Sequence, residues 1–296
     1  MMDFWFFSDL VRMFEYPFIQ RTVIVGALVS LCAALLGVSL VLKRYAMIGS
    51  GLSNVGFASL AMASAFNLGK TPLRVAIPVV VLAAFLLLRI SESSKIKGDS
   101  AVALISTSSL AIGSIVIAST TGMNTDVCNY LFGSLLAMSM EDVWLSISLS
   151  VVVITLFVVF YNKIFAVTFD ETFAAATGSK TGIYNMIIAF LTAITIVVGM
   201  RLMGTMLISS LVVFPALTSM RLCKKFSTVT ICSAVVSFVC FFIGIVLSFR
   251  HDIPAGASIV IVDVAAFIIF SAVSMVGVAT GLYKKVFGKQ KLGRFL

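Results

Sequence analysis

The sequence is dominated by long apolar segments that are almost free of Asp, Glu, Lys and Arg. A helix needs about 20 apolar residues to span the hydrocarbon core of a bilayer. Nine segments reach this length, provided that two arginines near the ends of the third extend toward the membrane surface: 22–42, 45–69, 71–90, 100–125, 143–162, 181–200, 202–220, 226–249 and 264–283. Strands of a membrane barrel take only about ten residues each. The sequence therefore predicts an all-α, polytopic membrane protein with about nine transmembrane helices, or eight if one segment does not span.

The composition excludes the soluble alternatives. Hydrophobic residues make up 60% of the 296 residues and charged residues only 11%, whereas soluble domains are about 25% charged. So few charges could not cover a soluble surface, which excludes a soluble enzyme and a nucleic-acid-binding domain. The five cysteines show no CxxC spacing, so neither a disulfide framework nor a zinc cluster is predicted. We find no nucleophile–base constellation or phosphate-binding loop, so we expect no enzymatic activity in this chain.

Two short segments are predicted to lie at the membrane surface. Residues 1–20 combine aromatic side chains with Asp9, Arg12 and Glu15, which is typical of an interfacial amphipathic helix rather than a cleavable signal. Residues 127–140 lie between acidic residues and are too short to span, which indicates an interfacial or re-entrant helix. The rest of the chain divides into a transmembrane domain, residues 21–283, and a basic tail, residues 284–296.

The positive charges predict the orientation in the membrane. Cytoplasmic loops of membrane proteins are enriched in Lys and Arg. If the loop after residues 143–162 is cytoplasmic and the nine spans alternate, 15 of the 21 Lys and Arg residues lie inside and 6 lie outside. We therefore expect an outer N-terminus and a cytoplasmic C-terminus. The net charge of +9 then reflects topology and is no evidence for a nucleic-acid partner.

The loop KIFAVTFDETFAAATGSK, after the fifth span, contains the signals of a short helix at about residues 168–179. Thr168 is a suitable N-cap, acidic residues follow at the positive end of the helix, and a glycine is available to end it. The residues assigned to this helix are Phe169, Asp170, Glu171, Phe173 and Gly178. Two interpretations fit the pattern: an ordinary surface helix, or a docking helix for a cytoplasmic motor protein.

Two stretches bring polar and small residues into the spans. In the second span, Ser50 and Asn54 are four residues apart and share one helix face. Residues 199–216 are interrupted by glycine and proline, as in broken helices that are packed in protein or face a cavity. The residues singled out are Gly49, Ser50, Ser53, Asn54, Ser209 and Pro215. Each stretch either packs helices together or lines a transport path.

Two further features involve acidic groups. His251 and Asp252 form the only His–acid pair of the chain and are either solvated in an outer loop or metal ligands. Asp263 directly precedes the last predicted span, so it lies either at the outer interface or inside the membrane, where a carboxylate is a functional candidate.

Taken together, these segments resemble the integral-membrane permease of the zinc/manganese ABC importer family. The resemblance covers residues 17–278 and rests on five pieces in the family's order: PFIQRTVIVGALVSLCAALLGVSLVLKRYAMIG, NYLFGSLLAMSMEDV, VTFDETFAAATG, VGMRLMGTMLISSLVVFPALTS and IPAGASIV. It implies a homodimer in the cell membrane, cytoplasmic ATP-binding subunits that hydrolyse ATP, and an extracytoplasmic metal-binding protein. The helix at 168–179 then resembles the coupling helix of the ATPase contact, and zinc or manganese is the transported ion.

One departure from the family pattern concerns the metal. Where the family reads G-D-x-L-S-H, this chain reads Gly49-Ser50-Gly51-Leu52-Ser53-Asn54. The resemblance implies that the family's Asp and His are pore ligands, and these positions hold a hydroxyl and a carboxamide in this chain. Both groups are poorer ligands for Zn²⁺ or Mn²⁺ than a carboxylate and an imidazole.

Several interpretations remain after this departure. The chain passes metal through weaker contacts at Ser50 and Asn54, carries another substrate, or is a non-transporting scaffold. An ion-coupled secondary transporter that needs no ATPase is the alternative from another class. In each case we expect no cofactor bound by this chain.

Overall fold

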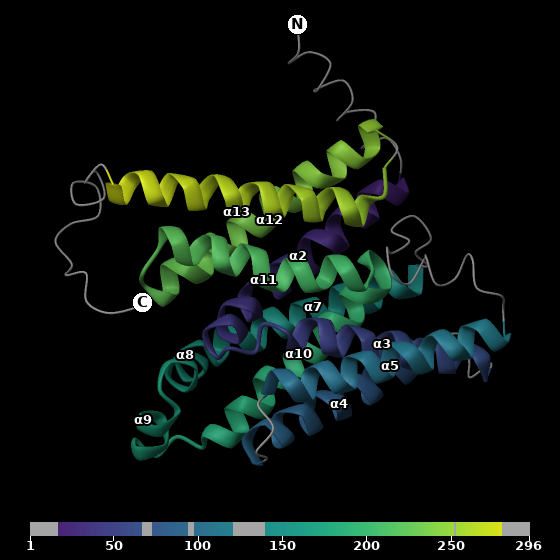
Figure 1. Cartoon of the computed structure of the whole chain (residues 1–296), viewed down its shortest axis with the longest axis horizontal. Coiled ribbons are helices and arrows are strands. Elements are labelled where there is room, and N and C mark those ends of the chain that lie inside the picture. The colour runs from purple at the N-terminus through teal and green to yellow at the C-terminus, as the bar shows by residue number, and fades with distance from the viewer. Residues whose placement is uncertain (1–16, 67–72, 94–97, 121–139, 252, 280–296) are drawn as a thin grey trace, which may run out of the picture.

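The computed structural model describes residues 17–66, 73–93, 98–120, 140–251 and 253–279. In these ranges the regular structure is helical and no strand occurs (Figure 1). In chain order the helices are α2 (Pro17–Leu42), α3 (Ile48–Ala65), α4 (Leu73–Ser93), α5 (Gly98–Thr120), α7 (Met140–Val159), α8 (Tyr161–Phe169), α9 (Glu171–Ala176), α10 (Thr181–Met203), α11 (Thr205–Leu222), α12 (Phe226–His251) and α13 (Ala255–Ala279). The predicted all-α fold is confirmed.

The predicted spans fall on separate helices of the described chain. Six helices (α2, α5, α10, α11, α12 and α13) are long and apolar enough to cross a membrane by themselves. Helix α7 forms a seventh candidate if it is combined with α8, to which it is bent by 70°. The apolar parts of α3 and α4 are shorter, at Ile48–Ala63 and Ala76–Leu87. The structure therefore supports a polytopic membrane protein, while the count of nine spans stays a prediction.

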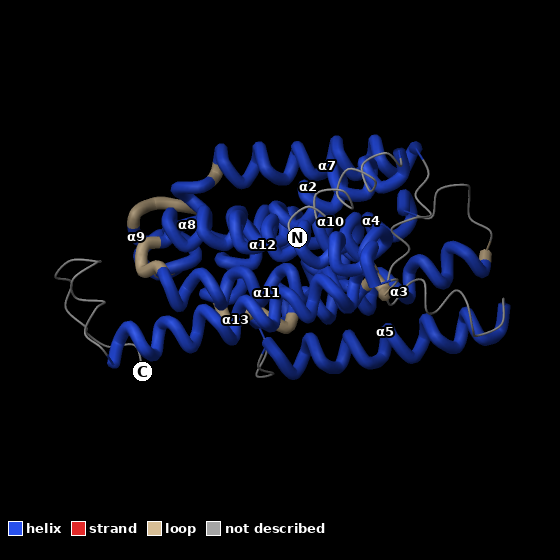
Figure 2. The backbone as a smooth tube through the Cα atoms, turned by 90° about the horizontal axis from the view of Figure 1, so that it is seen from above, coloured by secondary structure: helices blue, strands red, loops and turns tan. Residues whose placement is uncertain are grey.

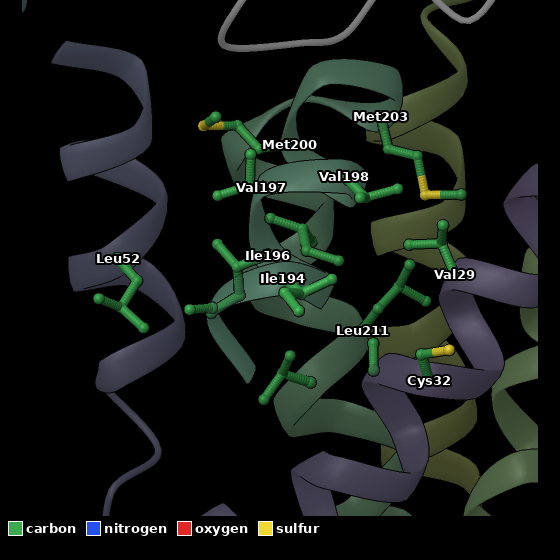
Figure 3. Close-up of a cluster of buried hydrophobic side chains, with 14 of the residues drawn as sticks. Val29, Cys32, Leu52, Ile194, Ile196, Val197, Val198, Met200, Met203 and Leu211 are labelled. Carbon is green, nitrogen blue, oxygen red and sulfur yellow. The ribbon is translucent and has the colours of Figure 1, made fainter. Parts of the chain in front are cut away.

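Helix α10 forms the centre of the bundle. Residues 191–200 are all buried, and a helix that is buried and apolar on all sides belongs to the protein interior. Figure 3 shows Ile196 of α10 facing Leu52 of α3, with Val29 of α2 and Leu211 of α11 in the same cluster. By contrast, only 22% of the apolar part of α5 is buried, against 72% for α10. Helices α5 and α7 form opposite edges of the bundle (Figure 2).

Small residues let the helices approach closely, as is typical of helix contacts in lipid. Gly37 of α2 lies so near α11 that an added Cβ would be 2.0 Å from the backbone oxygen of Val212. Gly51 of α3 makes a similar approach to α5, where an added Cβ would be 2.6 Å from a methyl carbon of Val102. These glycines set the spacing of α2 against α11 and of α3 against α5.

Two predicted boundaries were wrong. Helix α2 begins at Pro17, so residues 17–20 belong to the first membrane helix and not to an interfacial one; proline is favoured in the first turn of a helix because its missing N–H needs no partner there. The last span was predicted to begin at residue 264, but the apolar helix begins at Ala255. A search for charge-free segments stops at Asp263, whereas the fold buries this side chain within α13, beside Cys240 of α12.

Asp263 therefore lies inside the apolar segment Ala255–Met275. It is 1% exposed, and neither carboxyl oxygen has a hydrogen-bond partner among the described residues. A place within this candidate span supports the second of the two positions considered for it, inside the membrane. The interfacial segment at 1–16, the re-entrant helix up to residue 139 and the basic tail lie outside the described residues.

Candidate functional site

Ser50 and Asn54 share one face of α3, here called the polar stripe, and this face lies against α5. The side-chain amide of Asn54 donates a hydrogen bond to the Ser106 hydroxyl, with 2.7 Å between Nδ2 and Oγ. One turn earlier, the Ser53 hydroxyl donates to the backbone carbonyl of Ser50 at 2.9 Å. Ser50 and Asn54 are both partly buried. The stripe is thus part of a helix contact, and its partner is a serine of α5.

Sequence reasoning missed Ser106. The available signal was the polar run of residues 106–109, Ser-Thr-Ser-Ser, inside an otherwise apolar span. Such a run is costly in lipid unless its hydroxyls find acceptors. The neighbouring hydroxyls of Thr107 and Ser108 bond to carbonyls of their own helix, at Ala103 and Leu104. Ser106 instead accepts from α3, which distinguishes it within the run.

The chemistry of this contact is neutral. Ser50, Asn54 and Ser106 offer hydroxyl and amide oxygens, and these are weak ligands for Zn²⁺ or Mn²⁺. Among the residues that the structure describes, no group of three or more His, Cys, Asp or Glu side chains could hold a metal ion. The stripe can therefore contact a passing cation through neutral oxygens, and it joins α3 to α5.

The structure brings two other candidates together. An added Cβ on Gly49 of α3 would lie 3.9 Å from the Cα of Ser209 on α11, an ordinary packing distance. The Ser209 hydroxyl donates to the Thr205 carbonyl of its own helix at 2.7 Å. Ser53 is 1% exposed, and Pro215 is buried within α11. The observed contacts of these residues are those of helix packing, and their pore-lining role stays a prediction.

The helix α9 occupies the loop that the sequence singled out. Asp170 is its N-cap: Oδ1 accepts a hydrogen bond from the backbone N–H of Phe173 at 2.9 Å. Hydrogen bonds from the Thr172 hydroxyl and then from this N–H hold the pKa of Asp170 below its usual value. The predicted N-cap, Thr168, was wrong. It lies within α8, which continues to Phe169 and buries one side that consists of Ile164, Val167 and Thr168.

Gly178 ends this segment in the left-handed conformation, with φ of +81°. Its N–H donates to the Ala175 carbonyl, and the Ser179 N–H donates to the Ala174 carbonyl, both at 3.0 Å. This pair of bonds is the Schellman motif, which satisfies the last carbonyls of a helix. A helix of six residues is therefore fixed at both ends by its own sequence.

Helix α9 lies at one end of the bundle (Figure 1), and exposed aromatic side chains occur on it and on the end of α8. Phe169 is 58% exposed and Phe173 is 66% exposed. The rings of Phe165 and Phe169 pack on Phe226 of α12, with centroids 5.2 and 6.0 Å away. Contiguous exposed apolar groups of this kind mark interaction surfaces. We name Phe165, Phe169 and Phe173 the aromatic face.

Of the remaining candidates, Glu171 belongs to α9, whereas the pair of His251 and Asp252 lies far from it along the sequence. Glu171 lies in the first turn of α9, where its Oε1 accepts a hydrogen bond from Nδ2 of Asn185 at 2.7 Å. His251 is the last residue of α12 and is exposed. Asp252 lies outside the described residues, so the His–acid pair stays a prediction.

Comparisons with known proteins agree on one family. The model of the ABC 3 transport family matches residues 15–274. A probable metal transport system membrane protein of Thermotoga maritima is 31% identical over 89% of this chain and 91% of its own length. The manganese import system permease protein ScaB of Streptococcus gordonii is 27% identical over 86% of this chain and 91% of its own length.

Among solved structures, the chain is similar to one of PsaBC from Streptococcus pneumoniae in complex with Fab. The TM-score is 0.79 at 25% sequence identity, covering 89% of this chain and 94% of that chain. An inward-facing conformation of a putative metal-chelate type ABC transporter gives a TM-score of 0.67 at 16% identity, over 85% of both chains, and shows the same fold.

Proposed function

The chain belongs to the ABC 3 transport family, and from this premise we propose that it is the membrane permease subunit of an ABC importer for a divalent transition metal. The observation that carries the proposal is the family match over residues 15–274, most of the chain. Manganese is the first candidate ion, because the Streptococcus gordonii relative is named a manganese import system permease protein. Zinc is the second candidate. The permease acts as a homodimer with an extracytoplasmic metal-binding protein, and a separate cytoplasmic chain hydrolyses ATP.

In this proposal α9 is the coupling helix. The aromatic face is exposed, and Phe173, at 66%, is the most exposed of its three residues. Phe169 packs on Phe226, which brings the α11–α12 turn with Lys224 and Lys225 to the same end as α9. Clustered lysines favour the cytoplasmic side. This supports an ATPase contact at α9 and a cytoplasmic C-terminus.

The metal passes along the α3 stripe in this proposal. Ser50 and Asn54 stand where the family resemblance places an Asp and a His, so the ion meets neutral oxygens. Weak ligands favour release over retention, which suits passage through a membrane. The same observation supports a second candidate function, a family member that assembles with the ATPase but moves no metal.

Reconstitution of the chain with its ATPase and metal-binding protein in proteoliposomes tests the proposal. We expect ATP-dependent manganese uptake. Assembly and ATP hydrolysis without uptake of manganese or zinc would favour the scaffold, and failure to bind any ATPase would contradict both candidates.

Phe173→Asp tests the coupling helix. A buried aromatic anchor contributes about 2 kcal/mol to an interface, so ATPase affinity should fall roughly thirtyfold. The matched control is Ala175→Asp, which adds the same charge at an exposed position of the same helix. The unfolding midpoint of both variants should equal that of the wild type. Equal ATPase binding by the two variants would contradict this role of Phe173.

A further inference from the structure

A chain of three polar side chains connects α9 to two membrane helices. Glu171 of α9 accepts a hydrogen bond from Asn185 of α10 at 2.7 Å. The Asn185 carbonyl oxygen in turn accepts from the ammonium group of Lys43, which directly follows α2. Nζ of Lys43 also lies 4.0 Å from Oε2 of Glu171. We name these three residues the polar joint.

The joint is buried on the membrane-helix side and open on the α9 side. Asn185 is 6% exposed and the Lys43 side chain 11%, whereas the Glu171 side chain is 49% exposed. Hydrogen bonds to charged groups are stronger than neutral ones, and burial increases this difference. The Asn185 amide is suited to the middle position, because it accepts from the cation and donates to the carboxylate.

Apolar packing holds α9 only weakly. Ala174 is the one residue of α9 that is buried. Next to the joint lies a cavity of about 240 Å³, lined by Lys43, Glu171, Asn185 and Thr168, among others. The Thr168 hydroxyl is buried there without a hydrogen-bond partner among the described residues. Because α9 rests beside open space, polar bonds rather than close packing connect it to α2 and α10.

The two helices at the other end of the joint are central to the bundle. Helix α10 packs on α2, α3, α4 and α11, and α2 packs on α7, α11 and α12. A movement of α9 that pulls on Lys43 and Asn185 would therefore act on the whole core. We propose that Lys43 and Asn185 are positioning residues that transmit movement of the coupling helix to α2 and α10. This inference rests on the proposed function of the chain as an ATP-driven permease.

The test separates transmission from docking. The variants are Lys43→Met and Asn185→Leu, which keep size and remove the polar bonds. The controls, Lys180→Met and Asn162→Leu, make the same replacements at exposed positions. Each variant is assembled with the ATPase and metal-binding protein in proteoliposomes, where manganese uptake and ATP hydrolysis are measured together.

We expect both joint variants to bind the ATPase and hydrolyse ATP like the wild type, while manganese imported per ATP hydrolysed falls roughly tenfold. Lys43→Arg, which keeps the charge, should retain most of the ratio. Misfolding would lower ATPase binding as well, so the ratio isolates the joint. An unchanged ratio in both variants, with a wild type that transports, would overturn this inference alone. A wild type that binds no ATPase would overturn the proposed function and this inference with it.

Hydrogen exchange of the purified chain gives a second measurement that needs no partner. Loss of the joint should speed amide exchange in residues 171–176 by roughly tenfold and leave α12 unchanged. Unchanged exchange in α9 of Asn185→Leu would show that the joint does not hold α9 and would overturn the inference.

Discussion

Two of the polar contacts between helices, the Asn54–Ser106 contact and the polar joint, differ in charge and surroundings. The contact of Asn54 with Ser106 is a single neutral hydrogen bond of 2.7 Å between α3 and α5. It lies in a close-packed seam, where an added Cβ on Gly51 would be 2.6 Å from Val102. The polar joint is charged, includes three elements and borders a cavity of about 240 Å³.

The difference concerns how each contact responds to movement. Dispersion and hydrogen bonding weaken steeply when atoms separate by an ångström. Attraction between opposite charges falls only with the inverse of distance. The α3–α5 seam is therefore suited to keep two helices in register. In the joint, the attraction between Lys43 and Glu171 still acts when the hydrogen bonds lengthen, so the joint is suited to stay connected while α9 moves. Metal binding, stability and hydrogen exchange each test this distinction.

The largest expected effect is on metal binding at the α3–α5 seam. Ser50→Asp combined with Asn54→His places a carboxylate and an imidazole four residues apart, and both are good ligands for manganese. The affinity of the purified chain for Mn²⁺ should rise about thirtyfold, or roughly 2 kcal/mol. Electron paramagnetic resonance of the free ion measures it.

The matched control is Thr107→Asp with Ala111→His, which places the same pair four residues apart on the exposed side of α5. A comparable gain in the control would show that any such pair binds metal. No gain in either would mean that the stripe is not a metal position.

A smaller effect is expected on stability. Asn54→Leu leaves the Ser106 hydroxyl without its donor, which costs about 1 to 2 kcal/mol. Adding Ser106→Ala should recover part of the loss, because neither polar group is then left unpaired. The free energy of unfolding in detergent, measured for both single variants and the double variant, gives the coupling. Strict additivity would contradict the seam as described.

The smallest effect is expected next to the joint. Gly178 has φ of +81°, a conformation that costs other residues about 1 kcal/mol. Gly178→Ala should therefore speed amide exchange of α9 about fivefold while leaving the global unfolding midpoint unchanged. Gly182→Ala is the control, because an added Cβ there meets no atom within 4 Å. If the amides of α9 exchange at the same rate in both variants, the turn at Gly178 does not constrain α9.

The sequence predicts the location of α9 well because its signals are local. Asp170 and Gly178 determine the two ends of α9 through bonds to backbone groups within five residues. The error at Thr168 has a physical reason. Thr and Asp are both good N-caps, and the choice depends on whether α8 continues, which is decided by the burial of Ile164 in the core.

Partners across helices could not be predicted. Asn54 and Ser106 are 52 residues apart, and Lys43 and Asn185 are 142 residues apart. Their pairing depends on how helices are placed against one another, which glycines such as Gly51 and the core side chains decide together. In the sequence, Lys43 is one of the 15 basic residues that predict the cytoplasmic side, and a basic residue after a span looks the same whether it marks topology or binds a partner. Asp263 is an error of the opposite kind. The search for charge-free segments placed the last span after Asp263, whereas helix packing buries this residue within α13.

The burial of α10 has a consequence for how the protein is made. In the finished bundle residues 191–200 are covered by protein, yet a new membrane helix first stands in lipid before its neighbours join it. Its threonine hydroxyls need no partner from another helix at that stage, because Thr192 and Thr195 donate to the carbonyls of Ile188 and Leu191 within α10. The apolar surface of α10 thus contacts two environments in succession, first lipid acyl chains and then protein side chains. The order in which the helices insert into the membrane therefore affects how this core is assembled.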